Sequence, residues 1–490
     1  MRRILAGIET EYGLQVSGRG AAEQIDDAAA LVRSYPGECL PVWDYRYESP
    51  RADLRGFQQA RLNYDPEDAK FDVGRSRGPD SEVRSDRILP NGARLYNDHG
   101  HPEYSTPECW SLEALAKHDQ AGELAVLAAA RSYAAREGVE VRIYKNNTDF
   151  HGASYGTHEN YLVPRSLAYE QLLRAVTPML VVRQLLTGAG KVGSESGAAC
   201  NFQLSQRADF FTELANVDTL YRRPIFNTRD EPHSRPSDWI RLHVISGDAN
   251  MMPACTARKV ALVKLAVALA EIGEAPVWHL PDPVRTFQQI SRDPTLAQPI
   301  ELTGRNWTTV REIFESYFAA AEARLDLDAE LCSSISECRS LLDSLEQEGW
   351  YALKRDVEWA AKRAIIETVV EGEGMEWSDP TLQAYDLEYS NVDPEEGLYH
   401  ALVHMGEVQN PQELDASLLE RHIERTRAYV RGVAVSKFRD QVQTACWRSI
   451  TFDKGAEVLE LELPPDMEYP EHLQDAPDVE SFIKAIGGTA

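Results

Sequence analysis

Residues 91–105 of the chain read NGARLYNDHGHPEYS, and this stretch carries the clearest indication of the fold. Its alternating pattern predicts a strand over residues 90–97. Side chains two positions apart in a strand point to the same face, so Arg94, Tyr96 and Asp98 share one face. Charged and polar groups therefore stand where a buried strand would carry apolar side chains, which indicates a sheet with one functional, polar face.

Three further predicted strands carry paired polar side chains on one face. The pairs are Glu9 with Glu11 after the apolar run at residues 4–8, His158 with Asn160 within residues 156–163, and Arg241 with His243 within residues 240–246. Together with Asp98 and with Glu103, which follows a turn, their carboxylates and imidazoles could bind divalent metal, and the arginines suit phosphate. A single pair is more often a structural or surface feature. Four such strands in one chain favour a site for metal and nucleotide.

No phosphate-binding loop of the usual kinds accompanies these strands. The chain has no Walker motif, no GxGxxG that opens a helix after a strand, and no G-x-S-x-G elbow. The run Gly188-Ala189-Gly190-Lys191 resembles half a P-loop but lacks its spacing, and we interpret it as a flexible turn. If ATP binds, metals and arginines must hold its phosphates.

Composition narrows the class of partner. The chain has 490 residues and a formal net charge of -27, which argues against nucleic acid or an anionic membrane surface as the main partner. Its seven cysteines show no metal-ligand spacing and are odd in number, so we expect reduced thiols in a cytoplasmic protein. We also expect no signal peptide, because Glu9 and Glu11 interrupt the N-terminal apolar run, and no membrane span, because no stretch approaches the roughly 20 apolar residues that a bilayer requires.

The pattern of the chain changes from mixed to helical and back. Residues 1 to about 245 predict strands mixed with helices, including a helix over 112–137 and a strand over 139–144, so an α+β class fits better than a doubly wound sheet. Residues from about 256 to 430 predict helices. These are a helix with a capping box at Thr309 and Glu312, a helix over 351–371, and one that starts at Asn410-Pro411 and runs towards Val430. Asp453-Lys454-Gly455 predicts a hairpin within a small C-terminal domain that begins near residue 415.

These segments resemble the family that comprises the Pup ligase and the Pup deamidase, or depupylase. The resemblance covers nearly the whole chain. Its main segments are GIETEYG at 7–13, residues 91–105, KNNTD at 145–149, GASYGTHENYL at 152–162, QLSQR at 203–207, NTRDEPH at 227–233, RLHVI at 241–245, and Trp447 before ITFD at 450–453.

The resemblance implies a glutamine-synthetase-like catalytic domain over residues 1–414, with a curved, mainly antiparallel sheet covered by helices. It implies a small C-terminal domain over 415–490 and a loop insertion over 45–88 that flanks the active site. It also implies that ATP, or ADP plus phosphate, binds with Mg²⁺ on the curved face of this sheet. The implied partners are a disordered Pup-like tag that ends in Gln or Glu and the proteins that carry it, with neither nucleic acid nor a membrane involved.

Residue roles follow from the resemblance by position. Asp98 matches the essential aspartate, which acts either as a base towards water or as a nucleophile that attacks the tag's carbonyl. The positions that match metal ligands are Glu9, Tyr96, Glu103, His158 and His243. The positions that match nucleotide contacts are Arg94, Ser105, Thr106, Asn160, Arg241 and Trp447.

The sequence leaves three functions open, which we rank in the following order. The first is a hydrolase that deamidates the tag's C-terminal glutamine and cleaves the tag–lysine isopeptide bond. The second is a ligase that forms this bond with ATP, and the third is a silent tag-binding module. The segments 43–50, 54–57, 98–103 and 152–155 resemble the deamidase branch, whereas Gly7-Ile8-Glu9 is closer to the ligase, and residues 58–85 match neither.

The charge of the chain creates a difficulty for an acidic tag. A protein at -27 repels such a tag at long range, so binding requires a locally basic groove. The candidate residues for this groove are Arg46, Arg51, Arg55, Arg183, Lys191, Arg207, Arg222 and Arg223. Any one of them is more often part of an ordinary ion pair.

Overall fold

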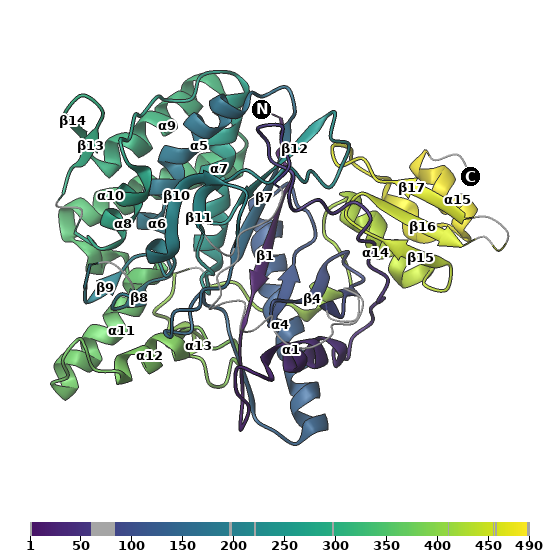
Figure 1. Cartoon of the computed structure of the whole chain (residues 1–490), viewed down its shortest axis with the longest axis horizontal. Coiled ribbons are helices and arrows are strands. Elements are labelled where there is room, and N and C mark those ends of the chain that lie inside the picture. Colours follow the sequence, from purple (N-terminus) through teal and green to yellow (C-terminus); the bar gives the residue numbers. More distant parts are fainter. Residues whose placement is uncertain are drawn as a thin grey trace.

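A computed structural model describes residues 2–59, 84–195, 198–219, 222–295, 298–409, 411–453, 455 and 458–487. Its centre is an antiparallel sheet whose strands lie in the order β12-β7-β1-β5-β4-β3 (Figure 1). These strands are β1 Ala6–Glu11, β3 Arg87–Ile88, β4 Arg94–Asp98, β5 His101–Ser105, β7 Thr157–Pro164 and β12 Trp239–Val244. The α+β class with a mainly antiparallel sheet is therefore confirmed.

The strand β1 shows why one face of this sheet is polar. Ala6, Ile8 and Thr10 are buried, and the first two belong to the main hydrophobic core. Glu9 and Glu11 alternate with them and are only partly buried. Because the period of a strand is two residues, β1 turns its apolar side chains to the core and its carboxylates to the opposite face.

Helices cover the apolar face. The helix α4 (Leu112–Glu137) packs against β1 and β5, and α7 (Pro253–Glu271) packs against β7 and α4. As predicted, α4 ends at Gly138, which adopts the left-handed conformation with φ 70°. The helix α5 (Tyr169–Val182) packs against α7 and joins both to the same core.

The remaining elements surround this sheet and its helices (Figure 1). Between β1 and α7 they are β2 Gly13–Val16, α1 Gln24–Arg33, β6 Val141–Tyr144, α6 Gln184–Thr187, β8 Lys191–Val192, β9 Phe202–Gln203, η1 Ala208–Phe210, β10 Phe211–Asn216 and β11 Arg223–Asn227. After α7 they are α8 Pro283–Ser291, β13 Ile300–Leu302, β14 Asn306–Thr308, α9 Val310–Arg324, α10 Ala329–Glu348, η2 Trp350–Leu353, α11 Glu358–Glu373, α12 Thr381–Tyr389, α13 Leu398–His404 and η3 Ala416–Leu419.

The C-terminal segment forms a unit with its own core, at the opposite end of the molecule from α8–α12 (Figure 1). Its elements are α14 Arg427–Lys437, β15 Val442–Ala445, β16 Ser449–Asp453, β17 Val458–Glu462, η4 Glu471–Asp475 and α15 Val479–Ile486. The hairpin predicted around Asp453 is present, because β16 and β17 pair antiparallel. Leu40, Trp43 and Ile88, from the first part of the chain, complete this core.

Two local predictions are wrong. The segment 411–426 is not one helix: it contains only the short turn η3, and α14 begins at Arg427, capped by Thr426. Glu424 instead accepts hydrogen bonds from the backbone of Trp110 and Ser111, so tertiary contacts override helix propensity.

The run at residues 188–191 is also not a flexible turn. All four residues are buried, and the N–H of Gly190 donates to the carbonyl of Leu204 at 2.9 Å. A Cβ at Gly188 would lie 2.2 Å from that same carbonyl oxygen. The glycines therefore permit close packing.

Other local predictions hold with shifted ends. The capping box of Thr309 and Glu312 is present. The helix expected over 351–371 begins later, at Glu358, whose carboxylate accepts hydrogen bonds from the backbone N–H groups of Met251 and Met252.

Within the part of the chain that the structure describes, no helix is both long and apolar enough to span a bilayer. Most of the predicted 45–88 loop insertion, residues 60–83, lies outside the described residues.

Candidate active site

The register of the central sheet brings the predicted site residues together. Glu9 lies opposite Ser105 on one side and His158 on the other, and Glu11 lies opposite Glu103. One strand further out on each side, Tyr96 pairs with Glu103 and His243 pairs with Asn160. Polar side chains from β12, β7, β1, β5 and β4 thus share one face of the sheet.

This face forms the wall of a cavity of about 300 Å³. The residues that line it include Glu9, Glu11, Arg94, Tyr96, Asp98, Glu103, His158, Arg241, His243 and Trp447. Two groups of potential metal ligands lie here, each with its ligand atoms within 4.8 Å of one another: Glu9 with His158 and His243, and Glu11 with Asp98 and Glu103. The first group offers a carboxylate and two imidazoles, and the second offers three carboxylates, which are oxygen donors of the kind that Mg²⁺ prefers.

The carboxylate group is electrostatically unfavourable without a cation. Burial, followed by the charges of Asp98 and Glu11, raises the pKa of Glu103 well above its ordinary value. Tyr96 donates its hydroxyl hydrogen to Glu103, and burial with the neighbouring Glu103 charge raises the pKa of Tyr96 as well. Three carboxylates that converge repel one another unless a positive charge sits among them. The donor set therefore fits a divalent cation.

Asp98 is held ionised in this setting. Burial alone would raise the pKa of its carboxyl, but His99, Arg84 and Arg94 together hold it below its ordinary value. Arg84 Nη1 lies 3.4 Å from Asp98 Oδ1, and His99 adopts a left-handed backbone with φ 49° in the turn after β4. A carboxylate that keeps its charge while only partly exposed retains the lone pair that a base or nucleophile needs.

In the group of Glu9, His158 and His243, the buried ring of His243 favours the neutral form. Burial and the charge of Arg241 lower the pKa of His243 well below its ordinary value. Its Nδ1 lies 2.8 Å from Asn160 Oδ1. Glu9 lies 3.5 Å from His158 and 3.7 Å from Arg241, which keep its pKa lowered despite burial. Neutral imidazole is the form that binds metal.

A second, smaller cavity of about 60 Å³ adjoins the first, because Glu9, His233, Arg241 and Trp447 line both. Ser105, Thr106 and Asn160 line only the smaller one, so these predicted nucleotide contacts do lie together. The hydroxyl oxygen of Ser105 is buried without a hydrogen-bond partner, whereas Thr106 accepts the backbone N–H of Ile8 at 3.0 Å.

Trp447 and Arg94 line the larger cavity, and each is held there by contacts with Trp43. Trp447 comes from the C-terminal unit and meets Trp43 edge to face at 4.9 Å between ring centroids. Arg94 lies with its guanidinium 4.1 Å from the Trp43 ring and 3.9 Å from the Tyr96 ring, and its ion pair with Asp86 is 2.6 Å long. Part of the charge of Arg94 is thus balanced within the protein.

Sequence reasoning missed several residues of this cavity. The strand spacing offers Glu11 as a metal-binding carboxylate, whereas the positions implied by the resemblance do not include it. Arg84, Arg229 and Glu231 also line the cavity. Burial lowers the pKa of Arg229, and its Nε has no hydrogen-bond partner. These three residues lie outside the polar strand pairs. Arg229 and Glu231 belong to the segment NTRDEPH at 227–233, but the resemblance assigns them no role, and Arg84 lies in the stretch 58–85 that matches neither branch.

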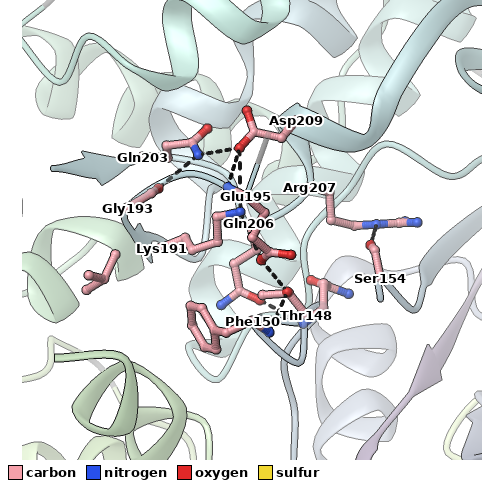
Figure 2. A network of polar contacts seen from close by, with 12 residues as sticks. Thr148, Phe150, Ser154, Lys191, Gly193, Glu195, Gln203, Gln206, Arg207 and Asp209 are labelled. Carbon is pink, nitrogen blue, oxygen red and sulfur yellow. Dashed lines mark hydrogen bonds and ion pairs between the residues drawn. The ribbon is translucent and has the colours of Figure 1, made fainter. Parts of the chain in front are cut away.

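A polar network supports another wall of the cavity (Figure 2). Arg207 lines the cavity beside Ser154, and its Nε donates to Ser154 Oγ at 3.4 Å. Deeper in the network, Thr148 donates to Glu195 at 2.5 Å, and the Nζ of Lys191 lies 3.2 Å from the same carboxylate oxygen. The network therefore joins the segment 148–154 to β8 and β9.

Several of the arginines and lysines predicted to form an exposed groove are in fact buried. Lys191 is 0% exposed between Glu195 and Asp209, and Arg183 is 2% exposed in a bidentate pair with Glu159. Neither can form an exposed groove, and that part of the prediction is wrong. Arg46 and Arg55 pair with the neighbouring carboxylates Asp44 and Asp53. Arg207 and Arg223 line the cavity, while Arg222 is exposed and pairs with Glu213.

Comparison with known proteins agrees with this geometry. The profile of the family described as Pup-ligase protein matches residues 3–451. The depupylase of Acidothermus cellulolyticus is 38% identical, over 92% of this chain and 91% of the relative. The Pup–protein ligase of Gordonia bronchialis is 36% identical, over 72% of this chain and 80% of the relative.

Two solved structures are similar over their length. The complex between the prokaryotic ubiquitin-like protein Pup and its ligase PafA superposes with a TM-score of 0.78 at 27% identity, covering 99% of this chain and 92% of that chain. The ligase PafA in complex with ADP superposes with a TM-score of 0.71 at 29% identity, covering 79% of this chain and 88% of that chain.

Proposed function

Because the chain belongs to the Pup-ligase protein family, we propose that it is a depupylase: a hydrolase that deamidates the C-terminal glutamine of a Pup-like tag and cleaves the tag–lysine isopeptide bond. Its partners are then the disordered tag and the proteins that carry it. The depupylase relative aligns with 92% of the chain and the ligase relative with 72%, which favours the hydrolase.

The single observation that carries the proposal is the carboxylate of Asp98, whose pKa is lowered, in a cavity lined by two groups of potential metal ligands. An amide carbonyl needs a nucleophile on one side and positive charge near its oxygen on the other. Asp98 supplies the lone pair, either to the carbonyl carbon or to a proton of the attacking water. Arg84 holds the carboxylate in position and keeps it charged.

The cavity also fits a nucleotide with magnesium, namely ATP or ADP plus phosphate. Glu9, Glu103, His158 and His243, with Tyr96 beside them, would hold Mg²⁺, which would supply positive charge for phosphate and for a polarised carbonyl oxygen. Ser105, Thr106, Asn160, Arg241 and Trp447 line the adjoining space for the nucleoside, and Arg94 lines the larger cavity. The similarity to the ADP-bound ligase supports this assignment.

The finer architecture follows the same proposal. Residues 1–414 form a glutamine-synthetase-like catalytic domain and residues 415–490 a small C-terminal domain, with the 45–88 insertion beside the active site. The separate core of the C-terminal unit supports this division. We place the reaction in the cytoplasm, since all seven cysteines are free thiols, as expected in a reducing compartment.

The test is to incubate the full chain with a glutamine-ended tag and with a glutamate-ended tag plus a lysine-bearing protein, each with and without Mg²⁺-nucleotide. Ammonia release from the first tag supports the depupylase. Isopeptide formation from the second, without ammonia release from the first, would show a ligase. Binding of both tags without turnover would show a binding module.

A further inference from the structure

A second group of metal-ligating side chains lies outside the cavity described above. Cys109, His118 and His422 place one ligand atom each within 4.8 Å of one another. Cys109 follows β5, His118 lies on α4, and His422 lies in the segment between η3 and α14. Cys109 and His118 are fully buried. Three distant parts of the chain thus converge on one buried point.

Hydrogen bonds orient His422 for a ligand. Its Nε2 lies 3.1 Å from the carbonyl oxygen of Glu108 and 2.9 Å from Thr426 Oγ1. Because a carbonyl oxygen can only accept, Nε2 carries the hydrogen and Nδ1 carries the lone pair. That Nδ1 points to His118 Nε2, at 3.0 Å. A histidine whose outer N–H is fixed by a backbone carbonyl is the arrangement found around bound metals.

His118 is less well satisfied. Its Nδ1 is buried and has no hydrogen-bond partner, and burial together with the nearby His422 lowers the pKa of the ring well below its ordinary value. The ring is therefore neutral, with its Nε2 directed at the shared point. Cys109 Sγ makes only a weak contact, donating to the carbonyl of Pro107 at 3.5 Å.

We propose that Cys109, His118 and His422 form a zinc-type site, distinct from the catalytic cavity, that fastens the segment leading into α14 to α4 and to the end of β5. One thiolate and two imidazoles are the donors that Zn²⁺ and Co²⁺ prefer and Mg²⁺ does not. Three protein ligands leave a fourth, tetrahedral position for water.

Binding exchanges a proton for the metal at sulfur. The S–H bond of Cys109 breaks, an S–metal bond forms, and that proton leaves to solvent. The hydrogen that His118 Nε2 donates to His422 Nδ1 passes to His118 Nδ1, which has no other partner, so both imidazoles present a lone pair. Two positive charges enter and one departs. Burial and the carboxylate of Glu424 raise the pKa of the thiol, while Lys264 acts in the opposite direction. The metal has to outweigh burial, as it does in structural sites where the thiolate is formed only on binding.

The site has a structural consequence for the reaction. Glu108, whose carbonyl orients His422, lines the smaller cavity, and α14 precedes the C-terminal strands between which Trp447 stands. A cation at this point would stabilise the docking of the C-terminal unit that supplies Trp447 to both cavities.

The experiment is a titration of the full chain with Co²⁺ in the presence of saturating Mg²⁺-ADP. A thiolate bound to Co²⁺ gives a charge-transfer absorption that carboxylates and imidazoles do not give, so the catalytic ligands stay silent. We expect one equivalent to produce this absorption, Zn²⁺ to abolish it by displacement, and Zn²⁺ to raise the Tm.

Matched variants decide the assignment. Cys109→Ser should remove the absorption and the Zn²⁺-dependent rise in Tm, whereas Cys255→Ser, which changes a buried cysteine on α7, should keep both. No absorption in the unaltered chain, or absorption that survives Cys109→Ser, overturns the proposal. If Cys109→Ser does not fold, His422→Gln should lower the Zn²⁺ affinity at least tenfold, and an unchanged affinity overturns it.

Discussion

At the scale of single residues, Asp98 carries the chemistry that the site requires. Asp98→Asn removes the ionised oxygen and preserves the shape of the side chain. We expect turnover of a glutamine-ended tag to fall by about 10²–10⁴-fold while nucleotide affinity stays within a few-fold. Single-turnover kinetics and calorimetry measure the two quantities.

The control for this change is Asp343→Asn on α10, where an exposed carboxylate pairs with Arg311. It should leave both quantities unchanged, because surface ion pairs contribute little. If Asp98→Asn retained near-normal single-turnover hydrolysis, Asp98 would not be the catalytic group.

The neighbours Arg222 and Arg223 should separate recognition of the tag from chemistry. Arg223 is 9% exposed and lines the cavity, so Arg223→Glu should impair turnover of both the full tag and a short C-terminal peptide. The Arg222 side chain is 55% exposed and pairs with Glu213, so Arg222→Glu should raise only the KM for the full tag, by a few-fold. Steady-state kinetics with the two substrates measures this, and equal effects of both variants on the peptide would contradict it.

The residues that could be predicted are those whose strand spacing reveals a shared face. Glu9, Asp98, His158 and His243 follow this rule, and the structure places them in one cavity. Arg84, Arg229 and the Cys109 group do not, because their side chains reach their sites from separate segments. Residues far apart in the sequence come into contact only through the register of the sheet and the course of the loops, and neither can be read from spacing along the chain.

At the scale of elements, the turn between β3 and β4 fits closely against α14. Gly92 has φ 82°, and a Cβ there would lie 2.2 Å from the carbonyl oxygen of Ala428. Gly138 has φ 70°, and nothing lies within 4 Å of its position for a Cβ. We expect Gly138→Ala to cost about 1–2 kcal/mol from backbone strain alone, and Gly92→Ala to cost about 1–3 kcal/mol more from overpacking.

Urea unfolding of the two variants measures this difference. Equal losses in the free energy of unfolding would show that α14 can move away from the turn. Arg431 binds the carbonyl of Gly92 with two N–H groups, at 2.9 and 2.7 Å, which is why we expect α14 to stay in place.

Elements were predictable where local signals agree with packing. The helix α4 has an apolar pattern and a terminal glycine, and its bounds match the prediction at both ends. The segment 411–426 has a helix-start signal but does not form one helix. The carboxylate of Glu424 instead accepts hydrogen bonds from the backbone N–H groups of Trp110 and Ser111. The order of the strands could not be predicted from alternation, because alternation defines a strand's faces and not its neighbours.

At the scale of the whole molecule, Glu108 connects the catalytic sheet to the C-terminal unit. Burial would raise the pKa of its carboxyl, but Arg431 and Arg427 lower it to about 2. Because the folded pKa lies below the ordinary 4.5, the stabilisation is complete above pH 4.5 and is lost as the pH falls towards 2. The shift corresponds to about 3 kcal/mol.

Glu108→Gln should therefore remove that part of the acid sensitivity. We expect the free energy of unfolding of the unaltered chain to fall more steeply between pH 4.5 and pH 3 than that of the variant, as measured by urea titration at each pH. Parallel profiles would show that the two arginines do not stabilise the charged form.

The overall charge predicts a weak response to salt. The chain carries a net charge of -27, yet Arg84, Arg207, Arg223, Arg229 and Arg241 line the cavity. Salt screens both the long-range repulsion of an acidic tag and the local attraction. We expect the KM for the full tag to change little between low and physiological ionic strength. A steep rise would mean that exposed complementary charge dominates binding.

The sharing of Leu40, Trp43 and Ile88 with the core of the C-terminal unit has a consequence for biosynthesis. A ribosome adds about 5–20 residues per second, so these three side chains are synthesised roughly 20–80 s before α14, which helps to cover them. During that interval the nascent chain exposes an indole and two aliphatic groups to any chaperone or neighbouring chain. Truncation before α14 would make that exposure permanent and leave a product prone to aggregation.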